Sequence, residues 1–475
     1  MGENNMKYDF DLICIGLGPA GMAVSAMGAE MGLKVCGIEK NKIGGECMNV
    51  GCIPSKSLLR IAKYRHSFIK LQQMGLEEGS IAGVKSPFEK INEYLEYIAE
   101  EKNMKMFDKV TLILDEGEAS FVDSNTIQVG NRTITARRIF IAAGAEPMIP
   151  PIKGLGDIDI LTNQNVFNLT EFPESMTIIG GGAIGCEMAQ AFSRLGTQCT
   201  IVQMDDFLLP NGEKSTGDYL EEIFKKEGIE VYNSRKITEV KNEFGNVTLL
   251  TEDGLKIISE KLLVAAGKRF DFSFLKLENA GVKYDKFGIE VDDKYRTSVN
   301  HIYAVGDCNG INLLTHAAMH QGMFAIMNAV SPWRMFKYRK YVIPWTVFTE
   351  PQVSMAGMKE EELKERGIKY QVYTARYENY AAAIAENVTK GYVKVFANGW
   401  GRVFGAVIVG DGSGEMANEW ALIIQKKIRM HSILFLAHSF PTMGFLTKRI
   451  AEQWMMAKMK SRFVKNLCRF CYRKL

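Results

Sequence analysis

The sequence predicts an α/β protein built from two doubly wound parallel-sheet units and a third, C-terminal α/β domain. Three observations predict it. An apolar run that leads into a glycine-rich turn, a helix and a second strand occurs twice, at Gly16 and at Gly180. The chain has 475 residues, which corresponds to about three domains. After Pro344 the composition changes to a new α/β segment.

The composition is that of a soluble globular protein, with 47% hydrophobic and 24% charged residues. A chain of this length can bury several cores, which excludes disordered, collagen-like and small disulfide-rich classes. The first apolar run, from Leu12 to Val24, follows acidic residues and is broken by glycines, so we expect no secretory signal. No run of 18 apolar residues occurs, so no spanning helix is expected. Nine scattered cysteines are typical of a reducing cytoplasm.

The charge is distributed unevenly. The net charge is +3, but residues 446–475 hold nine Lys or Arg and one acid, so that segment is +8 and the remainder is −5. A mildly acidic body argues against nucleic-acid binding by the whole protein.

The first unit begins with the strand Phe10–Ile15 and the turn Gly16-Leu17-Gly18-Pro19-Ala20-Gly21, followed by a helix to about Gly32 and a strand from Lys34 to Ile38 that ends at Glu39. This is the dinucleotide-binding pattern. The first glycine permits the tight turn, the second lets the backbone approach a pyrophosphate, and the third lets the helix pack on the strand. The helix N-terminus attracts phosphates, and the acid accepts from ribose hydroxyls.

The second unit repeats the first in register. Met176–Ile179 leads into Gly180-Gly181-Gly182-Ala183-Ile184-Gly185, a helix to about Leu195 and a strand from Gln198 to Val202. Gly21 and Glu39 are 18 positions apart, as are Gly185 and Gln203, so Gln203 takes the place of the acid. Two such Rossmann-like domains indicate two cofactors, most simply a flavin dinucleotide and a nicotinamide dinucleotide.

The segments between these units are also predicted from local patterns. We expect a charged helical region at Pro87–Phe107 and short strands from Val110 to Ile141, with prolines 147, 150 and 151 at a boundary. A second β-rich stretch ends at Gly267, and helices are expected near Lys359–Arg366 and Glu415–Met430.

The most informative segment is Gly44-Gly45-Glu46-Cys47-Met48-Asn49-Val50-Gly51-Cys52-Ile53-Pro54-Ser55-Lys56. Two cysteines five positions apart, after a glycine pair and at a helix start, suit a reversible disulfide. A thiolate near a helix N-terminus has a lowered pKa. Lys56 lies one helical turn after Cys52, on the same face.

With this segment the chain resembles the pyridine nucleotide–disulfide oxidoreductases, the flavoprotein disulfide reductases that include dihydrolipoamide dehydrogenase, glutathione reductase and mercuric reductase. The resemblance covers nearly the whole chain. It also rests on Ala142-Ala143-Gly144-Ala145, Gly267-Lys268-Arg269, Tyr303-Ala304-Val305-Gly306-Asp307 and Phe348-Thr349-Glu350-Pro351-Gln352-Val353.

The resemblance implies roles for these residues. Cys52 would face the flavin, Cys47 would meet the acceptor, and Lys56 would lie near flavin N5 and pair with Glu187. Asp307 would bind the ribityl chain or the phosphates. The expected FAD-binding residues are Gly16, Gly18, Gly21, Glu39, Gly45, Lys56, Gly144, Gly306 and Asp307. The expected NAD(P)-binding residues are Gly180, Gly182, Gly185, Gln203 and Gly267.

It also implies an organisation and a function. We expect residues 1–150 and 271–340 to form the two parts of an FAD-binding (central) domain, 151–270 an NAD(P)-binding domain, 341–445 a dimerisation domain, and 446–475 a basic amphipathic tail. The chain would be a homodimeric enzyme that passes electrons from NAD(P)H through FAD to the Cys47–Cys52 disulfide and on to an acceptor.

The chain departs from the family where the family carries a His-Pro followed by Glu. With Pro441 placed on the family's proline, Phe440 takes the histidine position and Phe445 the glutamate position. Phenyl rings move no protons, and general acid–base catalysis is worth about 10²–10⁴-fold, so we expect the acceptor not to be a standard small dithiol. Mercuric reductases also lack this histidine, so a mercuric or metal-ion reductase is one alternative. A lipoamide or other disulfide reductase with His438 as base is another; a structural role for His438 is the competing interpretation.

A second departure is Gln203, which is followed by Asp205 and Asp206. These acids would repel a 2′-phosphate, which favours NAD(H) over NADP(H).

The third departure is the tail, where Trp454, Met455, Met456, Met459, Phe463, Val464, Leu467 and Phe470 alternate with basic residues. This pattern indicates an amphipathic helix that packs on the protein's own body, lies on an anionic membrane surface, or docks a partner. We expect the protein to be cytoplasmic. Two alternatives follow from the tail: peripheral binding to the inner face of a membrane, and a role as the electron-transfer subunit of an assembly.

The tail contains Cys468-Arg469-Phe470-Cys471. This pair is a candidate secondary redox pair, two incidental cysteines, or half of a shared metal site. His316 and His320 share a helix face but have no evident third ligand, so we predict that they are structural or close to the flavin and that the chain has no metal site.

Overall fold

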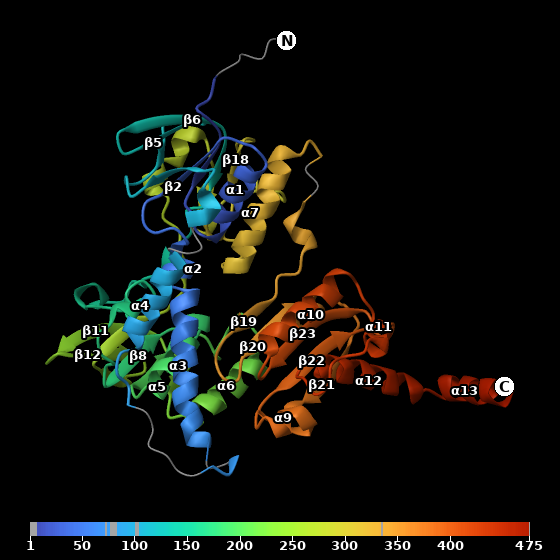
Figure 1. Ribbon diagram of the computed structural model, residues 1–475. Coiled ribbons are helices and arrows are strands. Elements are labelled where there is room, and N and C mark those ends of the chain that lie inside the picture. The colour runs from blue at the N-terminus through green and yellow to red at the C-terminus, as the bar shows by residue number, and fades with distance from the viewer. Residues whose placement is uncertain (1–6, 72–73, 77–82, 100–103, 334–335, 475) are drawn as a thin grey trace.

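The computed structural model describes residues 7–71, 74–76, 83–99, 104–333 and 336–474. It is an α/β protein, as predicted, with three main β-sheets and helices against them. In Figure 1 the first sheet lies at the top of the view, and the other two lie below it on opposite sides.

The first sheet has the strand order β3-β2-β1-β6-β5-β4, with β18 paired to β6. Its core is parallel, because β1 pairs in parallel with β2 and β6, β2 with β3, and β6 with β18. The strands are β1 Phe10–Ile15, β2 Val35–Glu39, β3 Thr111–Leu114, β4 Ser120–Phe121, β5 Thr126–Val129, β6 Arg132–Ile141 and β18 Ile302–Ala304. Helix α1 (Pro19–Glu30) packs against α7 (Thr315–Val330) beside this sheet.

The helices that link the first sheet to the rest carry the cysteine segment. They are α2 (Gly45–Asn49), α3 (Cys52–Lys70) and α4 (Pro87–Ile98). The helix predicted at 87–107 ends at Ile98, and a 3-10 turn covers Met104–Phe107. Residues 100–103 lie outside the described residues.

The second unit has a four-stranded parallel sheet in the order β10-β9-β8-β14. Its elements are β8 Ser175–Ile179, α5 Ala183–Arg194, β9 Gln198–Val202, α6 Lys214–Lys226, β10 Glu230–Tyr232 and β14 Lys261–Val264. An antiparallel sheet adjoins it, formed by β11 Ile237–Glu243, β12 Asn246–Thr251 and β13 Lys256–Ser259. Two small strand pairs accompany the sheets: β7 Glu146–Pro147 pairs with β15 Lys268–Arg269, and β16 Tyr284–Asp285 pairs with β17 Gly288–Ile289, whose Ile289 packs in the core of the first sheet.

The C-terminal region is a five-stranded antiparallel sheet in the order β19-β20-β23-β22-β21 with helices packed against it. Its elements are β19 Trp345–Val347, β20 Val353–Gly357, α8 Glu360–Glu365, β21 Gln371–Arg376, α9 Ala381–Ala385, β22 Tyr392–Ala397, β23 Val403–Val409, α10 Ser413–Gln425, α11 Met430–Phe435, α12 Phe445–Met459 and α13 Arg462–Lys474. The helix predicted at 415–430 ends at Gln425 because Lys427 has a left-handed backbone, with φ of 55°.

The predicted tail at 446–475 divides into two helices, α12 and α13. Helix α12 buries Leu446, Ile450 and Trp454 in the core of the C-terminal region, so it belongs to that region. Only α13 extends away from the body (Figure 1). The remaining domain limits stay a prediction.

Candidate redox site

The two cysteines lie at the junction of α2 and α3. Cys47 is within α2, and Cys52 is the first residue of α3. A Cβ on Gly51 would lie 2.9 Å from the carbonyl oxygen of Glu46, so the glycine lets the short connection fold back on α2. The two sulfurs are within hydrogen-bonding reach of each other.

The two thiols of this pair differ in acidity. A hydrogen bond from Cys47 is the largest cause that lowers the pKa of Cys52, to about 6, and the hydroxyl of Thr315 and the charge of Lys56 act in the same direction. The Sγ of Cys52 is 3.2 Å from Oγ1 of Thr315. The same sulfur–sulfur hydrogen bond, together with burial, raises the pKa of Cys47. When the pair is reduced at neutral pH, Cys52 is therefore the thiolate and Cys47 the thiol.

Five other cysteines have a raised pKa, in contrast to Cys52. Burial raises the pKa of each of them above that of a free thiol, and they are Cys14, Cys36, Cys186, Cys199 and Cys308. They are inert core residues, whereas the microenvironment of Cys52 is that of a reactive cysteine.

The predicted partner of Lys56 is in place. The Nζ of Lys56 is 2.6 Å from Oε2 of Glu187, whose side chain is only 4% exposed. The other carboxylate oxygen of Glu187 accepts the backbone N–H of Phe348 at 2.8 Å, and Lys56 lies over the Phe348 ring, 4.9 Å from its centroid. The ammonium is thereby fixed in one position beside the cysteine pair.

These groups line a cavity of about 1920 Å³. Most of the residues expected to hold FAD also line this cavity: Gly16, Gly18, Glu39, Gly45, Gly144, Gly306 and Asp307. A single hollow therefore extends from the first glycine turn to the cysteines.

The first glycine turn fits a dinucleotide. Gly16 has φ of 93°, and a Cβ on Gly21 would lie 1.8 Å from the carbonyl oxygen of Gly16, so helix and strand can approach only with glycine there. Gly144, also at positive φ, has open space where a side chain would stand. Glu39 accepts the backbone N–H groups of Leu17 and Asn41 at 2.8 and 3.0 Å. The turn is held open and its backbone is free to face a pyrophosphate, which is what FAD requires.

The second glycine turn has the same geometry. Gly180 has φ of 111°, and a Cβ on Gly185 would lie 1.9 Å from the carbonyl oxygen of Gly180. Ala183 and Ile184, at the start of α5, line the large cavity, so this helix N-terminus points into it. Gly180, Gly182, Gly185, Gln203 and Gly267 lie outside the lining of that cavity.

Gln203 is bound differently from Glu39. Its Oε1 accepts the N–H of Gly181 at 2.9 Å, as Glu39 does for Leu17, but its Nε2 donates to Oδ1 of Asn233 at 2.6 Å. The side chain is 3% exposed. Asp205 and Asp206 are exposed just beyond it. Gln203 therefore closes the turn without adding a negative charge at the end of β9.

Asp307 lies beside residues that sequence reasoning did not single out. Burial and the nearby carboxylate of Glu46 raise its pKa to about 6, while Lys268 opposes them. Glu46 accepts from Nζ of Lys268 and from Nδ2 of Asn163, the latter at 2.6 Å. Glu46 and Lys268 stand in the Gly-Gly-Glu-Cys and Gly-Lys-Arg motifs, whereas Thr315 and Asn163 had no such signal.

The two positions expected to carry the His-Glu dyad do meet, but as an aromatic pair. The rings of Phe440 and Phe445 have centroids 5.5 Å apart at an interplanar angle of 76°, an edge-to-face contact. Phe440 is 63% exposed, and Phe445 also stacks on Tyr380. Neither ring can accept or donate a proton.

His438 is held within its own region. Its Nε2 is 3.2 Å from Oε1 of Glu419 and its Nδ1 is 3.3 Å from the carbonyl oxygen of Leu436. The side chain is 8% exposed. Both ring nitrogens of His438 therefore contact oxygens of the C-terminal region.

The other candidates lie apart from the cysteine pair or have structural partners. Cys468 and Cys471 are exposed on α13. His316 is 2.6 Å from the carbonyl oxygen of Pro344, and His320 packs on Phe324 and Tyr341. Among the described residues, no cluster of three or more His, Cys, Asp or Glu side chains could hold a metal ion. No helix in the described ranges is long and apolar enough to cross a membrane.

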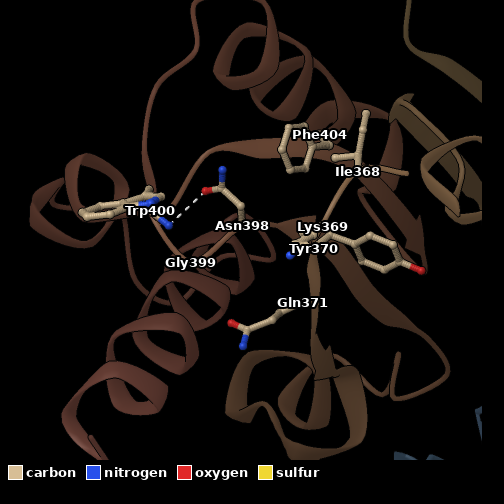
Figure 2. Close-up of a pocket in the computed structure, with 8 residues that line it drawn as sticks. All are labelled: Ile368, Lys369, Tyr370, Gln371, Asn398, Gly399, Trp400 and Phe404. Atoms are coloured by element: carbon tan, nitrogen blue, oxygen red, sulfur yellow. Dashed lines mark hydrogen bonds between the residues drawn. The ribbon is translucent and has the colours of Figure 1, made fainter. Parts of the chain in front are cut away.

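A second hollow of about 560 Å³ lies in the C-terminal region (Figure 2). It is lined by Ile368, Lys369, Tyr370, Gln371, Asn398, Gly399, Trp400 and Phe404. None of the predicted site residues contributes to it.

The chain matches two family descriptions. Residues 10–322 match "Pyridine nucleotide-disulphide oxidoreductase" and residues 343–449 match its dimerisation domain. A dihydrolipoyl dehydrogenase from Thermus scotoductus is 31% identical over 450 residues, which cover 92% of this chain and 95% of that protein. A mercuric reductase from Lysinibacillus sphaericus is 31% identical over 427 residues, covering 88% of this chain and 77% of that protein.

A solved structure shares the fold. The HOCl-induced flavoprotein disulfide reductase RclA from Escherichia coli superposes with a TM-score of 0.84 at 24% identity, covering 93% of this chain and 99% of that one. The chain belongs to the pyridine nucleotide–disulfide oxidoreductases, whose members are FAD-dependent oxidoreductases. The family identified from the cysteine segment is thereby confirmed.

Proposed function

We propose that this enzyme passes electrons from NAD(P)H to the Cys47–Cys52 disulfide and on to an acceptor other than the small disulfide of a dithiol couple. When bound, FAD would take a hydride from the nicotinamide and hand the electron pair to the disulfide. The observation that carries the choice of acceptor is the Phe440–Phe445 contact, which occupies both dyad positions.

The chain's own groups balance the first half of this reaction. One hydride supplies two electrons and one proton, and a disulfide that takes them up opens to one thiolate and one thiol. The lowered pKa of Cys52, at about 6, and the raised pKa of Cys47 support that division. Lys56 holds a positive charge beside the new thiolate, and Glu187 keeps it there.

The second half depends on where a proton goes. When the reduced pair attacks a small disulfide, the Cys47 thiol must lose a proton and the departing sulfur must gain one, and a base provides about 10²–10⁴-fold for such transfers. Phenyl rings at positions 440 and 445 offer no base. The rival assignment of His438 as that base is not favoured, because Glu419 and Leu436 engage both of its nitrogens.

Soft metal ions form one class of acceptor that avoids this requirement. A dithiolate binds and reduces such ions without a sulfur leaving group that must be protonated. Mercuric reductases are among the relatives, and the fold neighbour RclA has been solved as a Cu(II) complex. Within the described residues the two cysteines would supply the thiolate ligands, with the remaining positions taken by solvent.

The finer assignments follow from the same residues. We propose NAD(H) in preference to NADP(H), because Asp205 and Asp206 are exposed at the end of β9 and Gln203 is neutral. We propose a cytoplasmic homodimer formed through residues 341–445, on the basis of the matched dimerisation domain. Cys468 and Cys471 are placed outside the main electron path, as exposed residues of α13.

Anaerobic titration of the purified flavoprotein tests the first half. NADH and NADPH are added separately while flavin absorbance and free thiols are followed. We expect bleaching of the flavin and the appearance of two thiols per chain, with NADH acting at the lower concentration. A protein that binds no flavin, or whose thiol count does not change, would overturn the proposal.

A panel of acceptors tests the second half. The reduced enzyme is offered lipoamide, oxidised glutathione, a quinone, Hg(II) and Cu(II). We expect slow turnover of both disulfides and faster turnover of at least one of the other three. Lipoamide reduction by the wild-type enzyme at the rate of a Phe440→His, Phe445→Glu variant would show that the dyad positions do not limit the acceptor. Deletion of residues 461–475 tests a role as the subunit of an assembly, which predicts loss of a partner in pulldown.

A further inference from the structure

Helix α13 buries none of its residues against the body of the protein. It follows α12 after Lys460 and Ser461 and runs away from the C-terminal region (Figure 1). None of its residues from Arg462 to Lys474 is buried. The preceding helix is different: α12 places Leu446, Ile450 and Trp454 in the core. Leu446, Ile450 and Trp454 of α12 are therefore covered. Met456 and Met459, near the end of α12, are exposed, as are Phe463, Leu467 and Phe470 of α13.

The two sides of α13 are chemically distinct. Phe463, Leu467 and Phe470 recur at the spacing of one helical face, and Val464 and Cys471 join them. Phe463 is 74% exposed, Leu467 49% and Phe470 56%. The opposite side is formed by Arg462, Lys465, Asn466, Arg469 and Arg473. A helix with one broad apolar face and one basic face is stable only if something covers the apolar face.

The charges on α13 limit which kind of partner can bind its apolar face. Residues 462–474 contain five Lys or Arg and no acid. A coiled-coil partner is typically recognised through a narrow apolar seam with charges of both signs beside it. The apolar arc here is wide, it carries two phenylalanines, and Tyr472 stands at its edge. These features are typical of helices that lie in the plane of an anionic bilayer.

We propose that α13 binds the surface of an anionic lipid bilayer, with Phe463, Leu467 and Phe470 inserted among the acyl chains and the basic side directed at the headgroups. Thirteen residues of helix are about 20 Å long, less than the roughly 30 Å hydrocarbon core, so the helix lies on the bilayer and does not cross it. Lys474, whose Nζ stands 4.6 Å from the Phe470 ring centroid, reaches back to the headgroup level.

The dimerisation domain carries this helix, so a homodimer presents two copies of it. Two modest membrane contacts on one particle bind more tightly than either alone, provided that both reach the same surface. This inference rests on α13 and not on the identity of the acceptor, so the two proposals fail separately.

Flotation of the full-length holoprotein with vesicles tests the inference. The probes are vesicles of phosphatidylcholine alone and of phosphatidylcholine with phosphatidylglycerol. We expect binding to the second and little to the first, and we expect added salt to weaken it. Each Lys or Arg near an anionic surface contributes about fivefold to partitioning, so a variant with Arg462, Lys465, Arg469 and Arg473 changed to Gln is expected to lose at least about 100-fold. Phe463→Ser with Phe470→Ser is expected to abolish flotation while the basic side is intact.

A matched control removes the same charge elsewhere. Lys7, Lys85, Lys283 and Lys390 are exposed on the body, and their joint change to Gln is expected to leave flotation within about threefold of wild type, because charges away from the surface are screened. Flavin content and the rate of flavin reduction by NADH report that each variant is folded.

Three outcomes would overturn the proposal. Absence of flotation with both vesicles is one, and flotation that the Phe463, Phe470 variant retains is another. The third is a change in sedimentation coefficient on substitution of Phe463 and Phe470 without vesicles, which would place α13 in an interface between copies of the chain or on a protein partner.

Discussion

The proposed reaction draws on two regions of this chain that carry opposite kinds of side chain. Next to Cys52 stand a thiol, a hydroxyl and an ammonium, each of which favours a sulfur anion. In the segment 438–445 the two positions aligned with the family's dyad carry phenyl rings in edge-to-face contact, and His438 contacts Glu419. One region stabilises a sulfur anion, and the other offers two phenyl rings that can neither donate nor accept a proton.

This contrast teaches that the fold separates electron acceptance from proton handling. The groups around Cys52 come from α2, α3, α5 and α7. The groups that would exchange protons with an acceptor come from a different part of the chain, beyond residue 430. One set can change without the other, so an enzyme of this family can keep its disulfide and alter its acceptor.

The largest effect expected is at Cys52 itself. Cys52→Ser removes the sulfur that opens and closes in each cycle, so turnover of every acceptor that uses the disulfide is expected to fall at least about 1000-fold. Steady-state assays measure the fall, and flavin bleaching by NADH in a stopped-flow instrument shows that hydride transfer continues. Cys468→Ser, on the exposed helix, is the matched control. An equal loss in that control would move α13 into the electron path.

The next effect is a gain. Phe440→His with Phe445→Glu restores a base and the group that orients it, and dihydrolipoamide turnover is expected to rise about 100-fold. Each single variant is expected to gain less, because a lone His lacks its partner and a lone Glu lacks a base to orient. Assays with dihydrolipoamide and NAD+ measure the gain. A double variant no faster than the wild-type enzyme would mean that something other than proton transfer limits this acceptor.

A smaller effect concerns the pH dependence of the thiolate. Thr315→Val removes the hydroxyl 3.2 Å from Cys52 and is expected to raise the pKa of that thiol above its value of about 6. A thiol reacts with iodoacetamide only as thiolate, so alkylation falls as pH drops through the pKa, and the variant's profile shifts to higher pH. At pH 6 we expect alkylation of the reduced protein about fivefold slower than in wild type. Thr133→Val, on an exposed strand, is expected to leave the profile unchanged; identical profiles for Thr315→Val and wild type would exclude the hydroxyl as a cause.

The smallest effect is expected at His438. His438→Ala breaks the contact with Glu419 and is expected to lower stability by about 1 kcal/mol, while turnover stays within about twofold of wild type. Thermal unfolding and steady-state rates measure the two quantities. A loss of turnover above about tenfold, with flavin content unchanged, would identify His438 as the missing base and remove the contrast between the two regions.

Much of the fold was predictable because it depends on local patterns. The two glycine turns, their helices and their strands have the predicted limits to within a residue or two, since backbone sterics at Gly16 and Gly180 permit few alternatives. The Lys56–Glu187 pair spans 131 positions. Only the family resemblance could anticipate it, because spacing along a chain does not specify contacts between distant segments.

The parts that sequence reasoning missed share a physical cause. Thr315 and Asn163 reach the site from segments with no motif of their own, and their roles arise only from tertiary packing. The sequence left open what the tail packs on, because periodicity shows that a helix has an apolar face without showing what covers that face. Trp454 and Phe463 follow the same pattern, yet one is 7% exposed and the other 74%.

Glu187 joins three stretches of the chain with one side chain. Its two oxygens bind the ammonium of Lys56 on α3 and the backbone of Phe348, between β19 and β20 of the C-terminal sheet, while its own backbone belongs to α5. A glutamine at this position would keep the backbone bond and lose the counter-charge, and an aspartate would be too short for both partners. Loosening of the C-terminal third by heat or denaturant is therefore expected to change the colour of the bound prosthetic group before the parallel sheets unfold.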